Sequence, residues 1–377
     1  MMQIKAIKTL VVLVLPLLLL GCQTLASESS SGVIVARRAQ IRSSTAVVAA
    51  DLLQVNRGDQ VDILESTDVA DPSDNTRKER WLRVKARDED ATEGWIEARN
   101  VMPEEVLNEA KKLSEEDKDV PAQASGQLRA SSNLRLTPDR SGNENIMMRL
   151  DSGSSFDIVS WKRVPKPKAS EAIETDVAPK AGSAQPGSTR AGRQDDEETP
   201  EEENELWYKV RLSPNASPAP AGWIYGKQVE LAVPSDIIFY RTGREFVAWQ
   251  RLDGDSSRDR NAEKDGARDS RPGSWLILEK SSANQQRGVD EPQFDRIYVL
   301  GYDKRNQEHY TAYRSPDLRG YLPAKIEGQG DTKSFTIRLQ EVEGGEVKEV
   351  RYSVYKDARG VLRVNAPNIG TRDRRRR

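Results

Sequence analysis

The sequence predicts an all-β protein with two small closed sheets, a short helical linker between them and a C-terminal antiparallel β domain. Short apolar stretches alternate residue by residue with polar ones, as in strands that bury one face. Several of these stretches recur later in the chain in the same order, which indicates a duplicated module. Charged residues make up 31% of the chain and hydrophobic residues 36%, so part of it cannot contribute to a core.

The N-terminal segment has the pattern of an export signal. Lys5 and Lys8 precede an apolar run from Leu10 to Leu20. That run is shorter than the roughly 20 residues a membrane-spanning helix needs, and its basic flank is typical of a signal peptide. Cys22, the single cysteine of the chain, follows Leu19-Leu20-Gly21 and has no partner for an internal disulfide. The pattern resembles the lipobox of bacterial lipoproteins, with residues 1–22 as the signal segment.

This resemblance implies that Cys22 is acylated and that the chain is held to a membrane by lipid. Two or three acyl chains are expected on such a cysteine, and stable anchoring takes more than one. Gln23 replaces the Asp that favours inner-membrane retention in enterobacteria, so the expected location is the outer membrane, facing the periplasm. The polar, Ser-rich residues 23–32 would form a tether. The alternative is a plain secretory signal with an incidental cysteine.

Composition excludes some functions. Lys+Arg 58 against Asp+Glu 60 gives a net charge of −2, so no nucleic-acid partner is expected. His309 is the only histidine, and no glycine-rich phosphate loop or Gly-x-Ser-x-Gly motif is present. We therefore expect no catalytic residues, no metal and no cofactor. His309 is interpreted as a strand residue.

The repeat consists of three blocks. Gly58, Trp81 and Gly94-Trp95-Ile96 of the first copy correspond to Gly153, Trp207 and Gly222-Trp223-Ile224 of the second. The copies are assigned to residues 33–102 and 126–235. Between them, residues 103–125 are expected to form a helical linker whose apolar positions recur at helical spacing: Val106, Leu107, Ala110 and Leu113.

Each copy is interrupted between the same two predicted strands, by residues 66–80 in the first and by residues 162–205 in the second. The longer insert begins basic and ends acidic, with a middle rich in Ala, Pro, Gly and Ser. This composition is typical of disorder. Two interpretations stay open, a solvated surface loop or a charge-segregated arm that docks a partner.

The second copy resembles a bacterial SH3-like (SH3b) domain. It has Asn133-Leu134-Arg135 with Pro138, a strand after Gly153, Trp207 to Val210, and Gly222-Trp223-Ile224. The first copy has Gln40-Ile41-Arg42 without the proline, which leaves its first loop less certain. The resemblance covers roughly half of the chain after Cys22 and implies small barrels that bind peptidoglycan or peptides. Aromatic rings can stack on sugars or peptide, and the candidate contacts are Trp95, Trp161, Tyr208, Trp223 and Tyr225. The alternative is that these rings are core residues.

Residues 236–369 carry no motif of a known family and are expected to form an antiparallel meander, as a barrel or a sandwich. Strands are predicted at 237–240, 245–251, 274–278, 295–302, 309–314, 334–339, 347–355 and 361–364. The segment from Tyr313 to Tyr321 is either an ordered turn or a binding loop. Residues 370–377 are a basic tail, expected to be disordered or to touch anionic lipid or glycan phosphate.

Together these patterns favour a non-catalytic envelope lipoprotein that acts as an adaptor, with peptidoglycan or envelope proteins as partners and the membrane reached through Cys22. A structural scaffold of an envelope complex is the second hypothesis. An enzyme with a catalytic C-terminal domain is the third.

Overall fold

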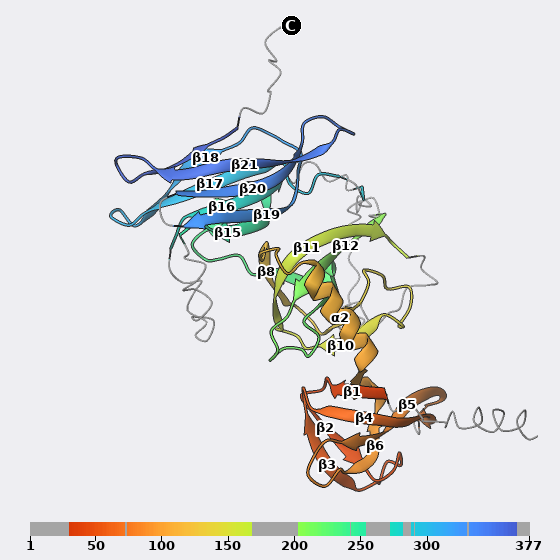
Figure 1. Ribbon diagram of the computed structural model, residues 1–377. Coiled ribbons are helices and arrows are strands. Elements are labelled where there is room, and N and C mark those ends of the chain that lie inside the picture. The colour runs from red at the N-terminus through yellow and green to blue at the C-terminus, as the bar shows by residue number, and fades with distance from the viewer. Residues whose placement is uncertain are drawn as a thin grey trace, which may run out of the picture. The chain divides into compact units, whose positions relative to one another are not determined.

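The computed structural model describes residues 30–71, 74–167, 203–241, 243–253, 272–281, 288–289, 291–329 and 332–367. Within these ranges the chain is all-β apart from one α-helix and three short 3-10 turns, as the sequence predicts (Figure 1). It divides into two compact units, Met1–Val106 and Leu107–Arg377. The predicted signal segment with Cys22 and the basic tail 370–377 lie outside the described residues, and the first strand begins within the predicted tether, at Ser30.

The first unit is built on one seven-stranded antiparallel sheet. Its strands are β1 (Ser30–Ile34), β2 (Arg38–Arg42), β3 (Asp51–Asn56), β4 (Gln60–Asp71), β5 (Asp74–Ala86), β6 (Glu93–Glu97) and β7 (Val101–Pro103). They lie in the order β3-β2-β6-β5-β4-β1-β7. Alternating side chains of the sheet, among them Ile41, Val84 and Ile96, form a fully buried core. The curled sheet is therefore a small barrel-like domain.

The second unit begins with a sheet of the same design. Its strands are β8 (Ala124–Leu128), β9 (Ser132–Arg135), β10 (Ile146–Leu150), β11 (Ser155–Pro165), β12 (Asn204–Arg211), β13 (Ala221–Tyr225) and β14 (Val229–Leu231). The order β10-β9-β13-β12-β11-β8-β14 reproduces that of the first sheet position by position. A 3-10 turn precedes the last strand in both, η1 (Ala98–Asn100) and η3 (Gly226–Gln228). The sequence repeat is a structural repeat.

An arginine at the equivalent position of each sheet, Arg42 or Arg135, forms hydrogen bonds to the loop that follows its strand. Arg42 lies opposite Trp95, and Arg135 lies opposite Trp223. Arg42 donates from Nη2 to the carbonyl oxygens of Val47 (2.7 Å) and Ala49 (3.2 Å). Arg135 donates from Nη1 to Gly142 O (2.7 Å) and Asn145 Oδ1 (2.6 Å). The arginine of each repeat therefore fixes the loop that follows its own strand.

The predicted helix is α2 (Glu104–Glu116), with Ala110 fully buried and the other three predicted apolar positions half-buried. Its C-terminal end is held by β12. Lys209 Nζ lies 2.7 Å from Glu116 Oε2 and 2.5 Å from Asp117 Oδ2. Arg211 donates to the carbonyl of Asp117 (2.9 Å). Cations at the C-terminal end of a helix complement its dipole and its unpaired carbonyls.

Both predicted inserts are partly strand. In the first sheet, β4 and β5 run as a long hairpin through most of residues 66–80. In the second, β11 continues to Pro165 and β12 begins at Asn204, so the interruption is shorter than predicted. Residues 168–202 lie outside the described residues. Glu205, which falls at the acidic end of the insert predicted to be disordered, is 5% exposed and pairs with buried Arg140.

The C-terminal region is a sandwich of two four-stranded meanders (Figure 1). One sheet contains β15 (Arg244–Arg251), β16 (Trp275–Ser281), β17 (Arg296–Asp303) and β18 (Glu308–Arg314). The other contains β19 (Gly320–Gln329), β20 (Thr332–Gln340), β21 (Val347–Lys356) and β22 (Leu362–Asn365). Leu278 and Ile297 of the first sheet share one buried core with Phe335 and Tyr352 of the second.

Two details differ from the strands expected in this region. Residues 237–240 are not a strand but contain a 3-10 turn, η4 (Ile238–Tyr240). Strand β19 was not expected, and the segment from Tyr313 to Tyr321 contains the end of β18, an ordered turn and the start of β19. Ser315 N and Leu318 N donate to the carbonyls of Ile297 and Asp295.

The second barrel is tied to the sandwich through buried amides. Gln123 precedes β8 and is fully buried. Its Nε2 donates to Ala324 O (3.0 Å), and Ala324 N donates to its Oε1 (2.8 Å). Gln250 Nε2 donates to the same carbonyl (2.9 Å), and Trp249 N donates to Gln123 O (2.8 Å). These bonds hold the start of β8 against β15 and β19.

Candidate functional site

A cavity of about 450 Å³ lies where the second barrel meets the sandwich. Trp161 and Tyr208 form part of its wall, and both are half-buried. They are direct partners across β11 and β12, so their rings project from the same face of the ladder. Phe246 of β15 contributes an apolar surface from the sandwich. Two of the five predicted contact residues are therefore brought together at one hollow.

Guanidinium groups lie near two of these rings, and the carboxylates Glu230 and Glu245 also line the cavity. Arg163 Cζ lies 5.9 Å from the ring centre of Trp161, and Arg241 Cζ lies 5.4 Å from that of Phe246. Arg129 adds a third cation from the barrel. Aromatic faces and planar guanidinium groups stack well, and arginine pairs with carboxylates through two parallel hydrogen bonds. The cavity can hold a ligand that combines a flat apolar or sugar face with a carboxylate.

On the sandwich side of the cavity, ion pairs and hydrogen bonds hold the basic side chains Arg244 and Lys280 in place. Arg244 lines the cavity and pairs with Asp295 and Asp317, the latter at 3.1 Å. Lys280 Nζ donates to Pro292 O (2.8 Å) and lies 3.6 Å from Glu291. These contacts fix where the positive charges sit.

Glu279, opposite Phe246 on β16, is 2% exposed. Burial raises the pKa of its carboxyl, and the nearby guanidinium groups of Arg244, Arg314 and Arg296 oppose that rise. The ionised form of Glu279 is thus less favourable here than in water, despite its cationic neighbours.

Trp161 is also held by its backbone. Gln293 Nε2 donates to Trp161 O (3.1 Å), while Leu322 N donates to Gln293 Oε1 (2.7 Å). Gln293 thus links β11 to β19. The ring itself packs against the sandwich core. Trp161 therefore contributes both to the contact between the second barrel and the sandwich and to the wall of the cavity.

The other predicted contact residues lie elsewhere. Tyr225 is 6% exposed, packs 5.5 Å from Trp207 and lies under Arg140, whose Cζ is 5.1 Å from its ring centre. It is a buried residue of the barrel wall. Trp95 and Trp223 are half-buried, occupy equivalent positions in the two repeats, and do not line the cavity.

Phe246, Arg241 and Lys280 were not among the residues singled out from the sequence. They carry no motif, and only the packing of β15 against the barrel brings them to the aromatic pair. Arg163 could have been identified as a site residue from the sequence, because it lies two residues after Trp161 at the start of a basic segment.

His309 is a strand residue, in β18. Its Nε2 is 2.8 Å from Gly273 O and 3.6 Å from Asp236 Oδ2, and its ring contacts Tyr240 and Tyr302. Trp275 Nε1 donates to the same Asp236 oxygen (2.9 Å). Across the described part of the chain, no three His, Cys, Asp or Glu side chains come together as a metal site, and no helix there is long and apolar enough to cross a membrane.

Comparisons with known proteins identify no family for this chain. No family model matches the chain, and no curated protein matches it. Two solved structures from Trichomonas vaginalis, NlpC2 and NlpC1, align at 9% and 12% identity. Each alignment covers 89% of this chain and 92% of the other, with a TM-score of 0.15. A likeness of that size carries no argument about this protein.

Proposed function

We propose that this protein is a lipid-anchored adaptor of the bacterial cell envelope, which binds peptidoglycan through its second SH3-like barrel. The motif at Cys22 supports the anchor, and the duplicated motifs support the module. The anchor would keep a non-catalytic binding body at the membrane, and the expected location remains the outer membrane, facing the periplasm.

The observation that carries this proposal is the pairing of Trp161 with Tyr208 at a cavity rimmed by arginines. Peptidoglycan offers both chemistries that such a site suits, because its sugars present apolar ring faces and its peptide stems end in carboxylates. Ring stacking would orient the glycan, and Arg163, Arg241 or Arg129 would pair with the stem. The cross-strand pairing of Trp161 with Tyr208 supports contact of one ligand with both rings.

Sedimentation with purified sacculi tests this proposal. The body lacking residues 1–22 should sediment with murein, and a soluble disaccharide-peptide fragment of murein should compete. Tyr208→Ala should weaken binding at least tenfold, which corresponds to about 1.4 kcal/mol. Trp161→Leu should weaken it similarly while keeping apolar volume at the joint.

Tyr355→Ala is the matched control, because Tyr355 is an exposed tyrosine of β21 that does not line the cavity. It should bind like the parent body. If the folded parent body stays in the supernatant, the peptidoglycan assignment is wrong. If the parent binds and Tyr208→Ala binds equally well, the ligand sits at another site.

A protein scaffold is the second candidate, and one observation favours it. The loop held by Arg42 exposes two valines, Val47 at 71% and Val48 at 93%, and the neighbouring Leu52 is 46% exposed. Exposed apolar side chains gathered on a fixed loop are typical of protein contacts. Crosslinking in cells should then capture a stable protein partner, and Val48→Asp should abolish that crosslink without weakening murein binding.

A further inference from the structure

Phe239 is the most exposed aromatic side chain among the described residues, at 87%. It lies in η4 (Ile238–Tyr240), the 3-10 turn that precedes β15. The neighbouring Ile238 is 40% exposed, so two large apolar side chains adjoin each other in the chain at the surface. Single exposed apolar residues are common in folded proteins, and the surroundings of Phe239 therefore decide whether it has a role.

The turn that carries Phe239 is fixed on both sides. Ile237 is fully buried, and its N–H donates to Pro234 O (3.1 Å). Tyr240 N donates to Ile237 O (3.0 Å), and the ring of Tyr240 packs edge-on against His309 with 5.4 Å between ring centres. Phe239 is therefore presented to solvent by an ordered turn, and a ligand that meets it does not have to order a loop.

The same turn forms part of the rim of the Trp161 cavity. Ile238 and Arg241 both line that cavity, and Arg241 packs over Phe246. Residues three apart lie on the same side of a 3-10 turn, so Ile238 and Arg241 share a side and Phe239 is turned away from it. Phe239 does not line the cavity, and its ring stands outside the rim, on the path of a ligand that leaves the cavity over η4.

The size of the cavity gives this position a consequence. A volume of about 450 Å³ is within the range of pockets that enclose one small ligand. Peptidoglycan is a polymer, so a strand with one unit in the cavity has to continue beyond the rim. The four residues from Ile237 to Tyr240 carry no charge, and an exposed aromatic ring among them suits the uncharged face of a sugar.

We propose that Phe239 stacks on a sugar of the glycan strand outside the cavity, an inference that rests on the proposed peptidoglycan function. Trp161 and Tyr208 would hold one unit of the strand, and Phe239 would hold a later unit of the same strand. The ligand is then a glycan strand of several units, which this protein binds in preference to a single disaccharide-peptide.

Isothermal titration with two murein fragments tests this preference, using the body that lacks residues 1–22. One fragment is a single disaccharide-peptide, and the other is an uncrosslinked chain of four such units. Affinities are compared per unit, so that the extra binding positions of the longer chain cancel. The parent body should bind the longer chain about tenfold tighter per unit, which is the gain expected from one stacked ring.

Substitutions of Phe239 show whether its ring is the source of that gain. Phe239→Ser should lose the gain for the longer chain and keep the parent affinity for the single unit. Phe239→Tyr keeps a ring that can stack, so it should retain both affinities.

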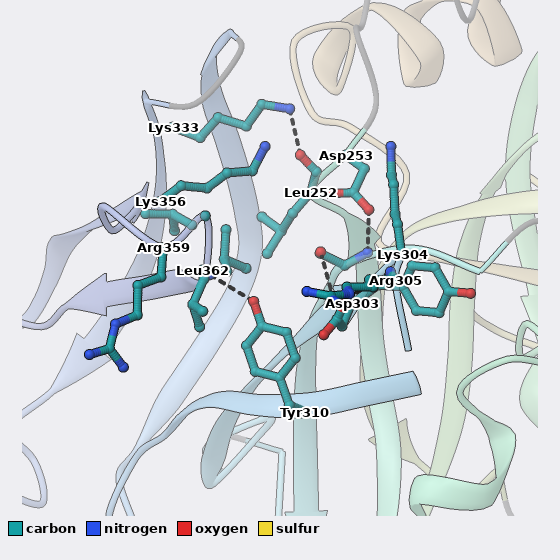
Figure 2. Close-up of a pocket in the computed structure, with 15 residues that line it drawn as sticks. Leu252, Asp253, Asp303, Lys304, Arg305, Tyr310, Lys333, Lys356, Arg359 and Leu362 are labelled. Carbon is teal, nitrogen blue, oxygen red and sulfur yellow. Dashed lines mark hydrogen bonds between the residues drawn. The ribbon is translucent and has the colours of Figure 1, made fainter. Parts of the chain in front are cut away.

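Two variants serve as controls. Val342→Ser removes another exposed apolar side chain, 66% exposed on the turn between β20 and β21 and outside the Trp161 cavity. Arg359→Gln changes the lining of a second cavity, of about 580 Å³, at one end of the sandwich (Figure 2). That cavity shares no lining residue with the Trp161 cavity. Both variants should bind the two fragments as the parent does.

If the folded parent body binds neither fragment, the proposed function is wrong and the role of Phe239 falls with it. If the parent binds the single unit but shows no gain for the longer chain, or if the gain survives in Phe239→Ser, only the role of Phe239 is wrong. An equal loss of affinity for both fragments in Phe239→Ser, or loss of the gain in Val342→Ser, would also overturn a stacking contact outside the cavity. Photocrosslinking from position 239 in cells should capture glycan, and capture of a protein in its place would overturn the proposal.

Discussion

Gln123 and Ala324 exchange two hydrogen bonds across the joint between the second barrel and the sandwich, a side-chain amide pairing with a backbone amide in both directions. The pair is fully buried on the Gln123 side, and it lies next to Gln250, which shares the Ala324 carbonyl. Neighbouring antiparallel strands exchange two backbone hydrogen bonds in the same reciprocal way. One side chain here takes the place of a neighbouring strand.

Gln123→Leu should loosen this joint. The substitution removes the acceptor for Ala324 N, and an unpaired buried donor costs about 1–3 kcal/mol. Hydrogen exchange should be faster at the Ala324 amide, with a matching drop in the free energy of unfolding. Gln127→Leu, an exposed position on β8, serves as control. Unchanged protection at Ala324 would contradict the role assigned to Gln123.

Arg140 and Glu205 form a buried, two-pronged ion pair with side chains 7% and 4% exposed. Arg140 Nε lies 3.0 Å and 2.9 Å from the two carboxylate oxygens. Arg140→Leu should cost about 3–5 kcal/mol, because it leaves a buried carboxylate unpaired. Arg140→Leu with Glu205→Leu should recover most of that loss in urea unfolding. A double variant as unstable as the sum of both single variants would show that the charges are not coupled.

Glu279→Gln should alter the pH dependence of stability. The folded-state pKa of Glu279 is raised by burial, so the folded chain holds this proton to higher pH than the unfolded chain. Its contribution to stability is fully present below the ordinary carboxyl pKa and is lost as pH rises through the folded-state pKa. The difference in unfolding free energy between Glu279→Gln and the parent should therefore grow in favour of the variant across that window. A constant difference between pH 4 and pH 7 would contradict the raised pKa.

Gly94 and Gly222 occupy the same position in the two barrels but should differ in tolerance. A Cβ at Gly94 would lie 2.5 Å from the backbone oxygen of Arg42, which cannot move aside. A Cβ at Gly222 would meet side-chain atoms of Met147 and Leu134, which can shift. Gly94→Ala should cost about 3 kcal/mol and Gly222→Ala about 1 kcal/mol, measured by calorimetry of each variant. Equal costs would show that the backbone approach at Gly94 relaxes.

Cys22→Ala tests the proposed anchor. The protein should leave the membrane fraction for the soluble envelope fraction, because no acyl chain can be attached. Fractionation followed by immunoblotting measures this, with the parent chain in parallel. Membrane association that persists in the variant would contradict lipid anchoring, as would an unmodified thiol in the mass spectrum of the native protein.

Local pattern was sufficient for most of the fold. Alternating residues predicted β2, β12, β13 and the strands of both meanders except β19, because one buried face imposes a period of two on the sequence. The matched blocks predicted a duplicated module, and the two sheets have the same strand order. Strand β19 escaped prediction, since Pro323 and Gly328 are poor strand residues and its pairing is irregular between Tyr321 and Lys325.

The sequence by itself determined the β class, the duplication, the helix at Ala110 and the aromatic candidates, all of which depend on neighbours along the chain. Only the tertiary structure decided which aromatics meet. It placed Trp161 and Tyr208 beside Phe246 and buried Tyr225 under Arg140. The reason is that exposure depends on packing between strands far apart in sequence, and a period of two fixes which residues share a face of a strand but not what covers that face.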